Sequence, residues 1–169
     1  MAIKRGAGIL PFARHKGSIY LFLGRENKEG GSSAAGKWSD FGGSKEGNES
    51  EFETALREGS EELSGIFGDM DNLSSLVNKT NIIIKTKTFY TYLMEVNYDP
   101  TKPIQLKTIY NDALENTPEL VHTHNGLYEK DRGIWLDIEK AEEFRPELRR
   151  WYNYMMTKII SYFKNDSKI

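Results

Sequence analysis

The chain has 169 residues, of which 38% are hydrophobic and 28% are charged, with no cysteine and a formal net charge of -2. This length is sufficient for one well-buried core, and the charge gives no general reason to expect a nucleic acid or an anionic membrane as partner. The absence of cysteine excludes disulfides and thiolate zinc sites, and a reducing, cytoplasmic setting is the expectation. Pro11 and Arg14 interrupt the N-terminal apolar segment, so we expect no signal sequence or membrane span there.

The first third of the chain predicts strands. Apolar runs over residues 7–12 and 18–24, separated by a polar turn, are typical of an antiparallel strand pair. Residues 25–37 form a glycine- and serine-rich stretch that is long for a compact domain, which favours a binding loop. The sequence "KWSDF" then predicts a short strand before the Gly42-Gly43 turn.

A helix is predicted over residues 50–64, where the apolar period changes. Phe52, Ala55, Leu56, Gly59 and Leu63 follow helical spacing. Either Asn48 or Ser50 can cap the start, because each has a glutamate three residues later.

The second half of the chain is less regular. Residues 81–96 predict one long strand or two, with Lys85 and Lys87 on one face, and residues 133–138 predict a strand that runs into a short helix. Residues 105–125 are ambiguous, with a possible helix over 106–114 and a polar loop after it. Pro146 suits the first turn of a C-terminal helix. The predicted buried stripe of this helix consists of Leu148, Trp151, Met155, Ile159 and Tyr162. The stripe is wide enough for a dimer contact, so both a monomer and a homodimer remain open.

The acidic residues of the predicted helix carry the chemistry. Glu58, Glu61 and Glu62 lie within roughly a quarter turn of one another, and we expect them opposite the apolar face. Like charges at these spacings repel by a few tenths of a kcal/mol per pair when exposed, so a bound divalent cation removes a penalty. Carboxylate oxygens favour hard ions, which predicts Mg²⁺ or Mn²⁺. Arg57 can orient the glutamates, and Gly43 lets the preceding loop approach the ion.

This stretch resembles the Nudix box, G-x5-E-x7-R-E-U-x-E-E-x-G-U, where U is a bulky aliphatic residue. Ser64 replaces the second glycine, and both U positions are glycine, namely Gly59 and Gly65. Because glycine inside a helix costs about 1 kcal/mol, we interpret Gly59 as permitting close packing against a strand. The fixed positions that agree are Gly43, Glu49, Arg57, Glu58, Glu61 and Glu62.

The resemblance implies one α/β domain over residues 1–169, the Nudix fold with a mixed sheet between helices. It also implies hydrolysis of a pyrophosphate linkage in a nucleoside diphosphate joined to another group. By position in the box, Glu58, Glu61 and Glu62 would be metal ligands together with the Gly43 carbonyl, and Arg57 would orient them. Glu58 would be a candidate base, and Glu129, with Glu119 behind it, a second base from a late loop.

Several alternatives remain open from the sequence. A non-catalytic Nudix-like module that binds a phosphate compound or nucleotide is the main one, and a salt-bridged surface helix is another. The substrate could be a nucleoside triphosphate, a dinucleoside polyphosphate, an inositol pyrophosphate or a capped RNA end, the last being the only nucleic acid expected. The basic residues predicted to grip its phosphates are Arg25, Lys37, Lys85 and Lys87.

Overall fold

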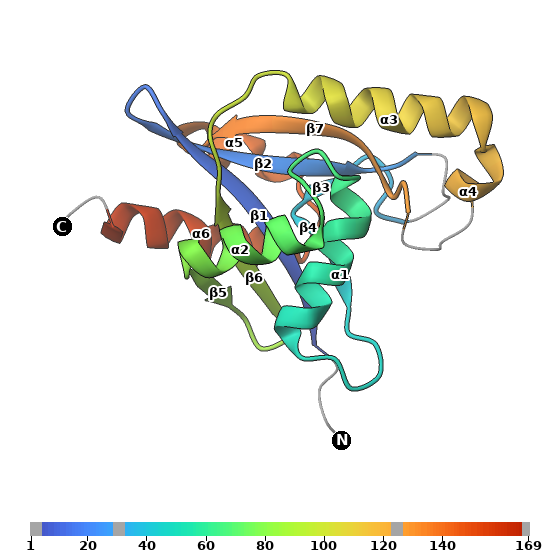
Figure 1. Cartoon of the computed structure of the whole chain (residues 1–169). Coiled ribbons are helices and arrows are strands. Elements are labelled where there is room, and N and C mark those ends of the chain that lie inside the picture. Colours follow the sequence, from blue (N-terminus) through green and yellow to red (C-terminus); the bar gives the residue numbers. More distant parts are fainter. Residues whose placement is uncertain (1–4, 29–32, 123–126, 167–169) are drawn as a thin grey trace.

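The computed structural model describes residues 5–28, 33–122 and 127–166, and it places a mixed sheet between two layers of helices (Figure 1). The α/β class predicted from the sequence is confirmed. The elements in chain order are β1 Gly6–His15, β2 Ser18–Glu26, β3 Trp38–Ser39, β4 Phe41–Ser44, α1 Glu51–Leu63, α2 Met70–Thr80, β5 Ile83–Lys85, β6 Phe89–Glu95, α3 Lys102–Asn116, α4 Pro118–His122, β7 Lys130–Asp137, a 3-10 turn Ile138–Lys140, α5 Ala141–Phe144, a second 3-10 turn Arg145–Glu147 and α6 Tyr152–Asp166.

Strand β1 organises the sheet. Along one edge its first half pairs antiparallel with β4 and its second half pairs antiparallel with β2, so the two partners share a single strand. Along the other edge β1 runs parallel to β6, which pairs in turn with β5. The predicted hairpin of β1 and β2 is confirmed, and β2 also carries β7 on its far edge.

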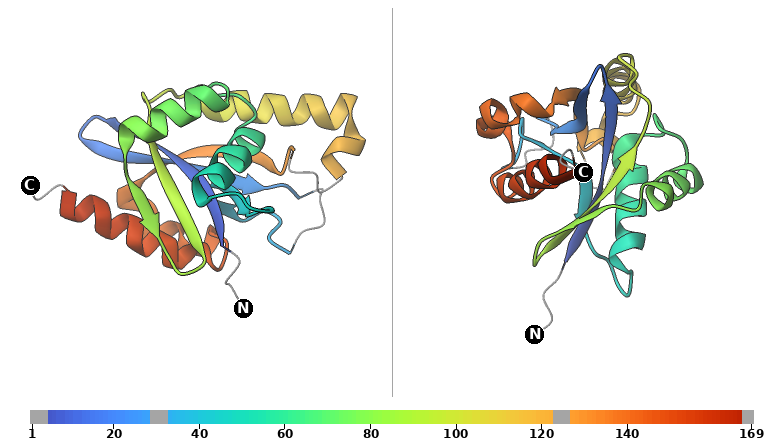
Figure 2. Two further views of the ribbon diagram at one scale, coloured as in Figure 1. Left: turned by 60° about the horizontal axis from the view of Figure 1, so that its bottom comes forward. Right: turned by 90° about the vertical axis from the view of Figure 1, so that its left-hand side faces the viewer.

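Each face of the sheet has its own core, because successive side chains of a strand alternate between faces. Ile9 belongs to the cluster under α1, α2 and α3, whereas its neighbour Leu10 belongs to the cluster under α5 and α6. The right-hand view of Figure 2 shows the sheet edge-on with these two helical layers on opposite sides. The catalytic candidates of α1 therefore lie on one side of the sheet and α6 lies on the other.

The helix over residues 50–64 is confirmed as α1, and its start is set by a capping box. The Ser50 hydroxyl accepts a hydrogen bond from the Glu53 backbone N–H, and the Glu53 carboxylate accepts one from the Ser50 N–H. The helix ends at Ser64, which adopts a left-handed conformation with φ 53°. Gly65 follows with φ 79°, so both residues at the exit take the left-handed backbone that glycine adopts most easily.

Several expectations for the second half need correction. Residues 81–96 form two strands, and Lys87 lies in the bend between them and not on a strand face with Lys85. Pro146 lies in a separate 3-10 turn, and α6 begins only at Tyr152. Trp151 is consequently 41% exposed and does not belong to the buried stripe. The residues of α6 that are buried are Tyr152, Met155, Met156, Ile159 and Phe163.

Two further helices were not predicted. Helix α2 follows α1, capped by Asp69, whose side chain accepts a hydrogen bond from the Asn72 N–H. Helix α4 occupies part of the segment expected to be a polar loop, after the predicted helix that is confirmed as α3. Among the described residues, none of the helices has the length and apolar character needed to cross a membrane.

Candidate active site

Two carboxylates of α1 face the sheet, contrary to the expectation that Glu58, Glu61 and Glu62 lie opposite the apolar face. Glu58 is 8% exposed and Glu62 is 2% exposed, and both share the buried side of the helix with Ala55. The reason is helical geometry: Glu62 follows Ala55 by seven residues, or nearly two complete turns, which returns it to the same side. Two carboxylates are therefore enclosed between α1 and the strands.

Two glycines allow this close approach. A Cβ added at Gly59 would stand 2.6 Å from Cδ1 of Ile9 on β1, so the predicted packing of Gly59 against a strand is confirmed. A Cβ added at Gly43 would stand 2.5 Å from the Glu58 carboxylate carbon, so only glycine leaves room for that carboxylate beside β4. The chain thus brings the backbone of β4 against an acidic group.

Arg57 holds the carboxylates on the outer side of the site. Its Nε and Nη2 donate to the two Glu49 oxygens at 2.6 and 3.1 Å, and its Nη1 donates to Glu58 Oε1 at 2.9 Å. Nη2 also donates to the Ser44 carbonyl at 3.0 Å, which ties the helix to the end of β4. Two further carboxylates lie within 4.0 Å of Nη1, those of Glu46 and Glu61.

The environment separates these carboxyl groups by acidity. Hydrogen bonding to Arg57 is the main cause that lowers the pKa of Glu49 to about 2. Burial raises the pKa of Glu58, although its bond to Arg57 opposes the change, and burial also raises the pKa of Glu61. Burial raises the pKa of Glu62 well above its ordinary value. Glu49 is therefore a fixed anion, whereas the other three groups hold their protons more tightly.

Lys130 and Glu26 complete the inner side of the site, and sequence reasoning missed both. The side chain of Lys130 is fully buried, and its ammonium lies 3.5 Å from Glu26 Oε2 and 4.0 Å from Glu62 Oε2. It donates a hydrogen bond to the Ser39 hydroxyl at 2.9 Å. Neither residue belongs to a motif, and only the pairing of β2 with β7 brings them together.

Glu129 lies within electrostatic range of the acidic group. Its charge raises the pKa values of Glu58, Glu61 and Glu62, although it immediately precedes β7 and is distant from them in sequence. The fold thus brings Glu129 near the half of α1 that carries Glu58, Glu61 and Glu62. Its catalytic role stays a prediction. Glu119, the reserve candidate, lies in α4.

The donor set fits a hard divalent cation. Glu62 Oε2 is buried without a hydrogen-bond partner among the described residues, because the Lys130 ammonium at 4.0 Å is too distant to donate one. A divalent cation would supply the direct bond that this oxygen lacks. In the described part of the chain, no three His, Asp or Glu side chains already converge on one point. Two of the predicted ligands are instead paired with Arg57, whose Nη1 lies 2.9 Å from Glu58 Oε1 and 3.7 Å from Glu61 Oε2. The predicted ligands are all oxygen donors, namely Glu58, Glu61, Glu62 and the Gly43 carbonyl.

The structure does not bring the four predicted phosphate-binding residues to this acidic site. Arg25 donates two hydrogen bonds to the Asp131 carboxylate, at 2.7 and 3.0 Å. Lys37 donates to the Pro146 carbonyl at 3.0 Å and lines a hollow beside α6. Lys85 and Lys87 line a second hollow beside α6. Their contact with the substrate of the acidic site therefore stays a prediction.

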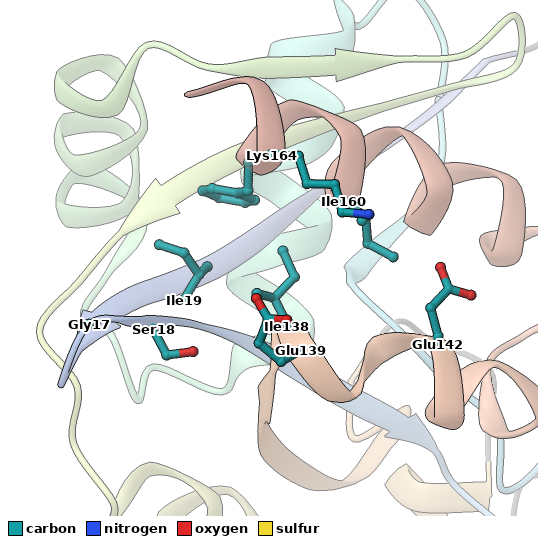
Figure 3. Close-up of a pocket in the computed structure, with 9 residues that line it drawn as sticks. Gly17, Ser18, Ile19, Ile138, Glu139, Glu142, Ile160 and Lys164 are labelled. Carbon is teal, nitrogen blue, oxygen red and sulfur yellow. The ribbon is translucent and has the colours of Figure 1, made fainter. Parts of the chain in front are cut away.

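A further pocket lies between the β1–β2 hairpin and α6, on the side of the sheet away from α1 (Figure 3). It encloses about 220 Å³, and Ile19, Ile138 and Ile160 form its apolar walls. Glu139, Glu142 and Lys164 are its charged members. None of the carboxylates of α1 lines it, so this pocket is separate from the candidate active site.

Comparison with solved structures identifies the fold. No family model matches the sequence, and no curated protein matches it. An Ap4A hydrolase from C. elegans, in a binary complex, is 13% identical over 96% of this chain and 99% of that chain, with a TM-score of 0.53. The Nudix domain of NrtR from Shewanella oneidensis, in complex with ADP-ribose, is 11% identical over 96% and 90%, with a TM-score of 0.55. RenU, a Nudix hydrolase from M. smegmatis, is 11% identical over 100% and 90%, with a TM-score of 0.50. The chain therefore has the Nudix hydrolase fold.

Proposed function

We propose that the protein is a Nudix-type pyrophosphohydrolase that cleaves a phosphoanhydride bond with the aid of Mg²⁺ or Mn²⁺. The observation that carries this proposal is the burial of two carboxylates, Glu58 beside Gly43 and Glu62 with one oxygen lacking a hydrogen-bond partner among the described residues. A surface helix held by ion pairs would leave its carboxylates exposed, whereas here the Glu62 carboxylate is buried with the Lys130 ammonium no nearer than 4.0 Å, and burying a charge without close pairing is costly. This arrangement argues against a purely structural role for α1.

The reaction adds one water across a P–O–P linkage. The water oxygen forms a bond to one phosphorus, the bridging oxygen leaves with the other phosphate, and a base accepts a proton from the water. A bound divalent cation would polarise a phosphoryl oxygen, lower the pKa of a water and neutralise charge on the leaving group. Glu58 and Glu129 are the candidate bases, and burial favours Glu58 because it raises the pKa of that carboxyl.

Arg57 contributes by position. It binds Glu49 and Glu58 at the same time, and its bond to the Ser44 carbonyl fixes the end of β4 beside them. Positioning of this kind is valuable because the ligands of a catalytic ion must keep their geometry during the reaction. Arg57 therefore orients the glutamates and leaves the chemistry to the carboxylates.

The substrate is expected to contain a nucleoside diphosphate linked to another group. The C. elegans neighbour is an Ap4A hydrolase, and the Shewanella neighbour binds ADP-ribose. Both ligands belong to this class, which supports testing a dinucleoside polyphosphate and a nucleoside diphosphate sugar first. Nucleoside triphosphates, inositol pyrophosphates and capped RNA complete the set of compounds that the sequence leaves open.

The decisive experiment is hydrolysis of this panel with and without Mg²⁺, by wild-type protein and by Glu62→Gln. We expect the substitution to reduce turnover by at least about a hundredfold, because it removes a metal ligand while it preserves side-chain size. The matched control is Glu115→Gln, the same chemical change at an exposed position of α3. Full activity of Glu62→Gln would overturn the assignment of Glu62 as a metal ligand of the active site. Binding without cleavage of any compound by the wild-type protein would instead support the alternative, a non-catalytic module.

A further inference from the structure

A basic and aromatic surface lies beside the start of α6, on the opposite side of the sheet from the candidate active site. It consists of two hollows that share Trp151. One hollow lies along the 3-10 turn and the segment before α6, and the other lies along the bend between β5 and β6. Figure 2 shows that bend beside α6. We call the two hollows together the Trp151 surface.

Among the described residues that line the Trp151 surface, every charged one is basic. One hollow is lined by Lys37, Arg145, Arg149 and Arg150, and the other by Lys85, Lys87 and Lys158. The whole chain has a net charge of -2, so this surface departs from the average composition. A local basic cluster of this kind attracts polyanions even when the protein as a whole is slightly acidic.

Most of these charges are available to a ligand. Arg145 pairs with Glu142 at 2.7 Å, and Arg149 stands 3.9 Å from Glu26. By contrast, Lys87 and Arg150 are exposed and have no carboxylate within 4.0 Å among the residues that the structure describes. Lys85 contributes less, because its ammonium lies 5.0 Å from the centroid of Tyr90, a ring that packs against the cluster under α1. The positive end of the α6 dipole lies at the same place and adds to the attraction for phosphate.

Two aromatic rings are exposed between these cations. Trp151 is 41% exposed and Tyr154 is 62% exposed, and their spacing of three residues places them on neighbouring parts of the surface. Trp151 packs against Phe89, with the ring centroids 4.7 Å apart, and the Arg149 guanidinium lies 5.6 Å from its centroid. Lys158 lies 5.7 Å from the Tyr154 centroid. Each ring is therefore accompanied by a cation.

We propose that the Trp151 surface binds single-stranded nucleic acid. Its lysines and arginines would neutralise backbone phosphates, and Trp151 and Tyr154 would stack on unpaired bases. A single strand fits better than a duplex, because only unpaired bases can present their faces to both rings. An acidic protein or an anionic membrane would use the charges but would leave the ring-and-cation pairs unexplained. This site goes beyond the proposed hydrolase function, and none of the carboxylates of α1 lines it.

The test is fluorescence anisotropy with labelled oligonucleotides of about 12 nucleotides, a length within the range of one single-strand binding site. Single-stranded RNA, single-stranded DNA and duplex DNA are titrated in EDTA, so that binding is measured without metal-dependent hydrolysis. We expect both single strands to bind more tightly than the duplex. We also expect their affinity to fall steeply as salt rises, because counterions are released on binding.

Two pairs of variants distinguish the contributions of stacking and of charge at the Trp151 surface from the contribution of the overall charge of the protein to binding. Trp151→Leu should weaken binding by at least about fivefold, whereas Trp151→Phe should retain most of it because a ring remains. Lys87→Gln/Arg150→Gln removes one exposed charge from each hollow and should weaken binding by about tenfold or more. It should also reduce the salt slope by about 1.4, since each phosphate contact on a single strand contributes about 0.7. The matched control is Lys79→Gln/Lys107→Gln, which removes the same charge from exposed positions of α2 and α3 and should change affinity less than about twofold.

Each contrary outcome overturns the proposal in a different way. Equal weakening by the control pair would mean that general charge attracts the strand. If Trp151→Leu binds the single strands as tightly as the wild type does, Trp151 does not stack on their bases. Tighter binding of polyglutamate, or of vesicles containing an anionic lipid, would assign the surface to a protein or a membrane. Failure of the hydrolase assay would leave this result untouched, because the binding measurement requires neither metal nor turnover.

Discussion

One arginine and the burial of its partners together determine the acidity of the outer site. Arg57 binds Glu49 through two of its nitrogens and Glu58 through the third, so one fixed positive charge is shared among several carboxylates. The unequal result follows from burial. Glu49 receives the best bonds and becomes strongly acidic, whereas Glu58 is enclosed and retains a raised pKa. One residue type thus supplies both a structural anion and a candidate base.

The low pKa of Glu49 predicts a pH-dependent contribution to stability. Its folded pKa of about 2 lies below the ordinary 4.5, so its stabilising effect is complete above about pH 4.5 and is lost as pH falls toward about 2. Glu49→Gln should therefore unfold at lower urea than the wild type at pH 7, and the difference should shrink through this window. Glu115→Gln is the control that should show no such trend. A difference that stays constant across the window would mean that the ion pair with Arg57 does not stabilise the fold.

Fixed spacing within a motif was the strongest signal for individual site residues, and Glu129 was proposed without one. Glu58 and Glu62 were identified as ligand candidates because they belong to one short helix, and the fold encloses both. Lys130 and Glu26 were not identified, because a buried lysine leaves no periodic signal in a strand and its partner lies on another strand. The prediction of an outward acidic face was wrong for a simpler reason: the apolar residues of α1 surround the carboxylates and do not face away from them.

At the scale of elements, α1 is placed by a glycine. Gly59→Ala would gain about 1 kcal/mol of helix propensity but would put a Cβ 2.6 Å from Ile9 Cδ1 in a buried core. Overpacking of a core costs about 1–3 kcal/mol, so we expect the substitution to be neutral at best and destabilising by up to about 2 kcal/mol. Urea unfolding measures the change.

The double variant Gly59→Ala/Ile9→Val tests the cause, because valine lacks Cδ1. The single change Ile9→Val should cost about 0.5–1.5 kcal/mol. If the clash is the cause, the double variant should be more stable than the sum of the two single effects by about 1 kcal/mol. If the effects of the two substitutions on the free energy of unfolding are strictly additive, the contact between Gly59 and Ile9 is not the reason for the glycine.

Element boundaries followed the sequence where local signals were strong. The capping box at Ser50 and the change of period identified α1, and the polar turn between apolar runs identified the β1–β2 hairpin. Helix α2 was missed although Asp69 caps it. The start of α6 was placed too early, because the Pro146 signal belongs to a separate 3-10 turn. Trp151 consequently moved from the predicted core to an exposed surface.

At the scale of the whole molecule, the sheet separates two opposite charge environments. The carboxylates of α1 lie on one face, and the basic Trp151 surface lies beside α6 on the other. The sequence could not predict this separation. Lys37 and Lys87 were expected beside the acidic site, and the side of the sheet on which a basic residue lies depends on strand pairing between distant segments.

The enclosed carboxylates predict that Mg²⁺ stabilises the whole fold. Their raised pKa values mean that the folded protein loses stability as pH rises from about 4.5 through those values, and a cation offsets this loss. At a concentration one hundred times its Kd, Mg²⁺ should add about 2.7 kcal/mol and raise Tm by about 5–10 °C for a domain of this size.

This stabilisation should itself depend on pH, since Mg²⁺ must displace the protons that the buried carboxylates hold. We therefore expect the Tm increase to be small at pH 5 and larger at pH 8, when measured by calorimetry against KCl of equal ionic strength. Glu62→Gln should lose the increase, whereas Glu115→Gln should keep it. If KCl raises Tm as much as Mg²⁺ does, the effect is only screening of surface charge. If the increase in Tm with Mg²⁺ does not depend on pH, the ion binds away from these carboxylates.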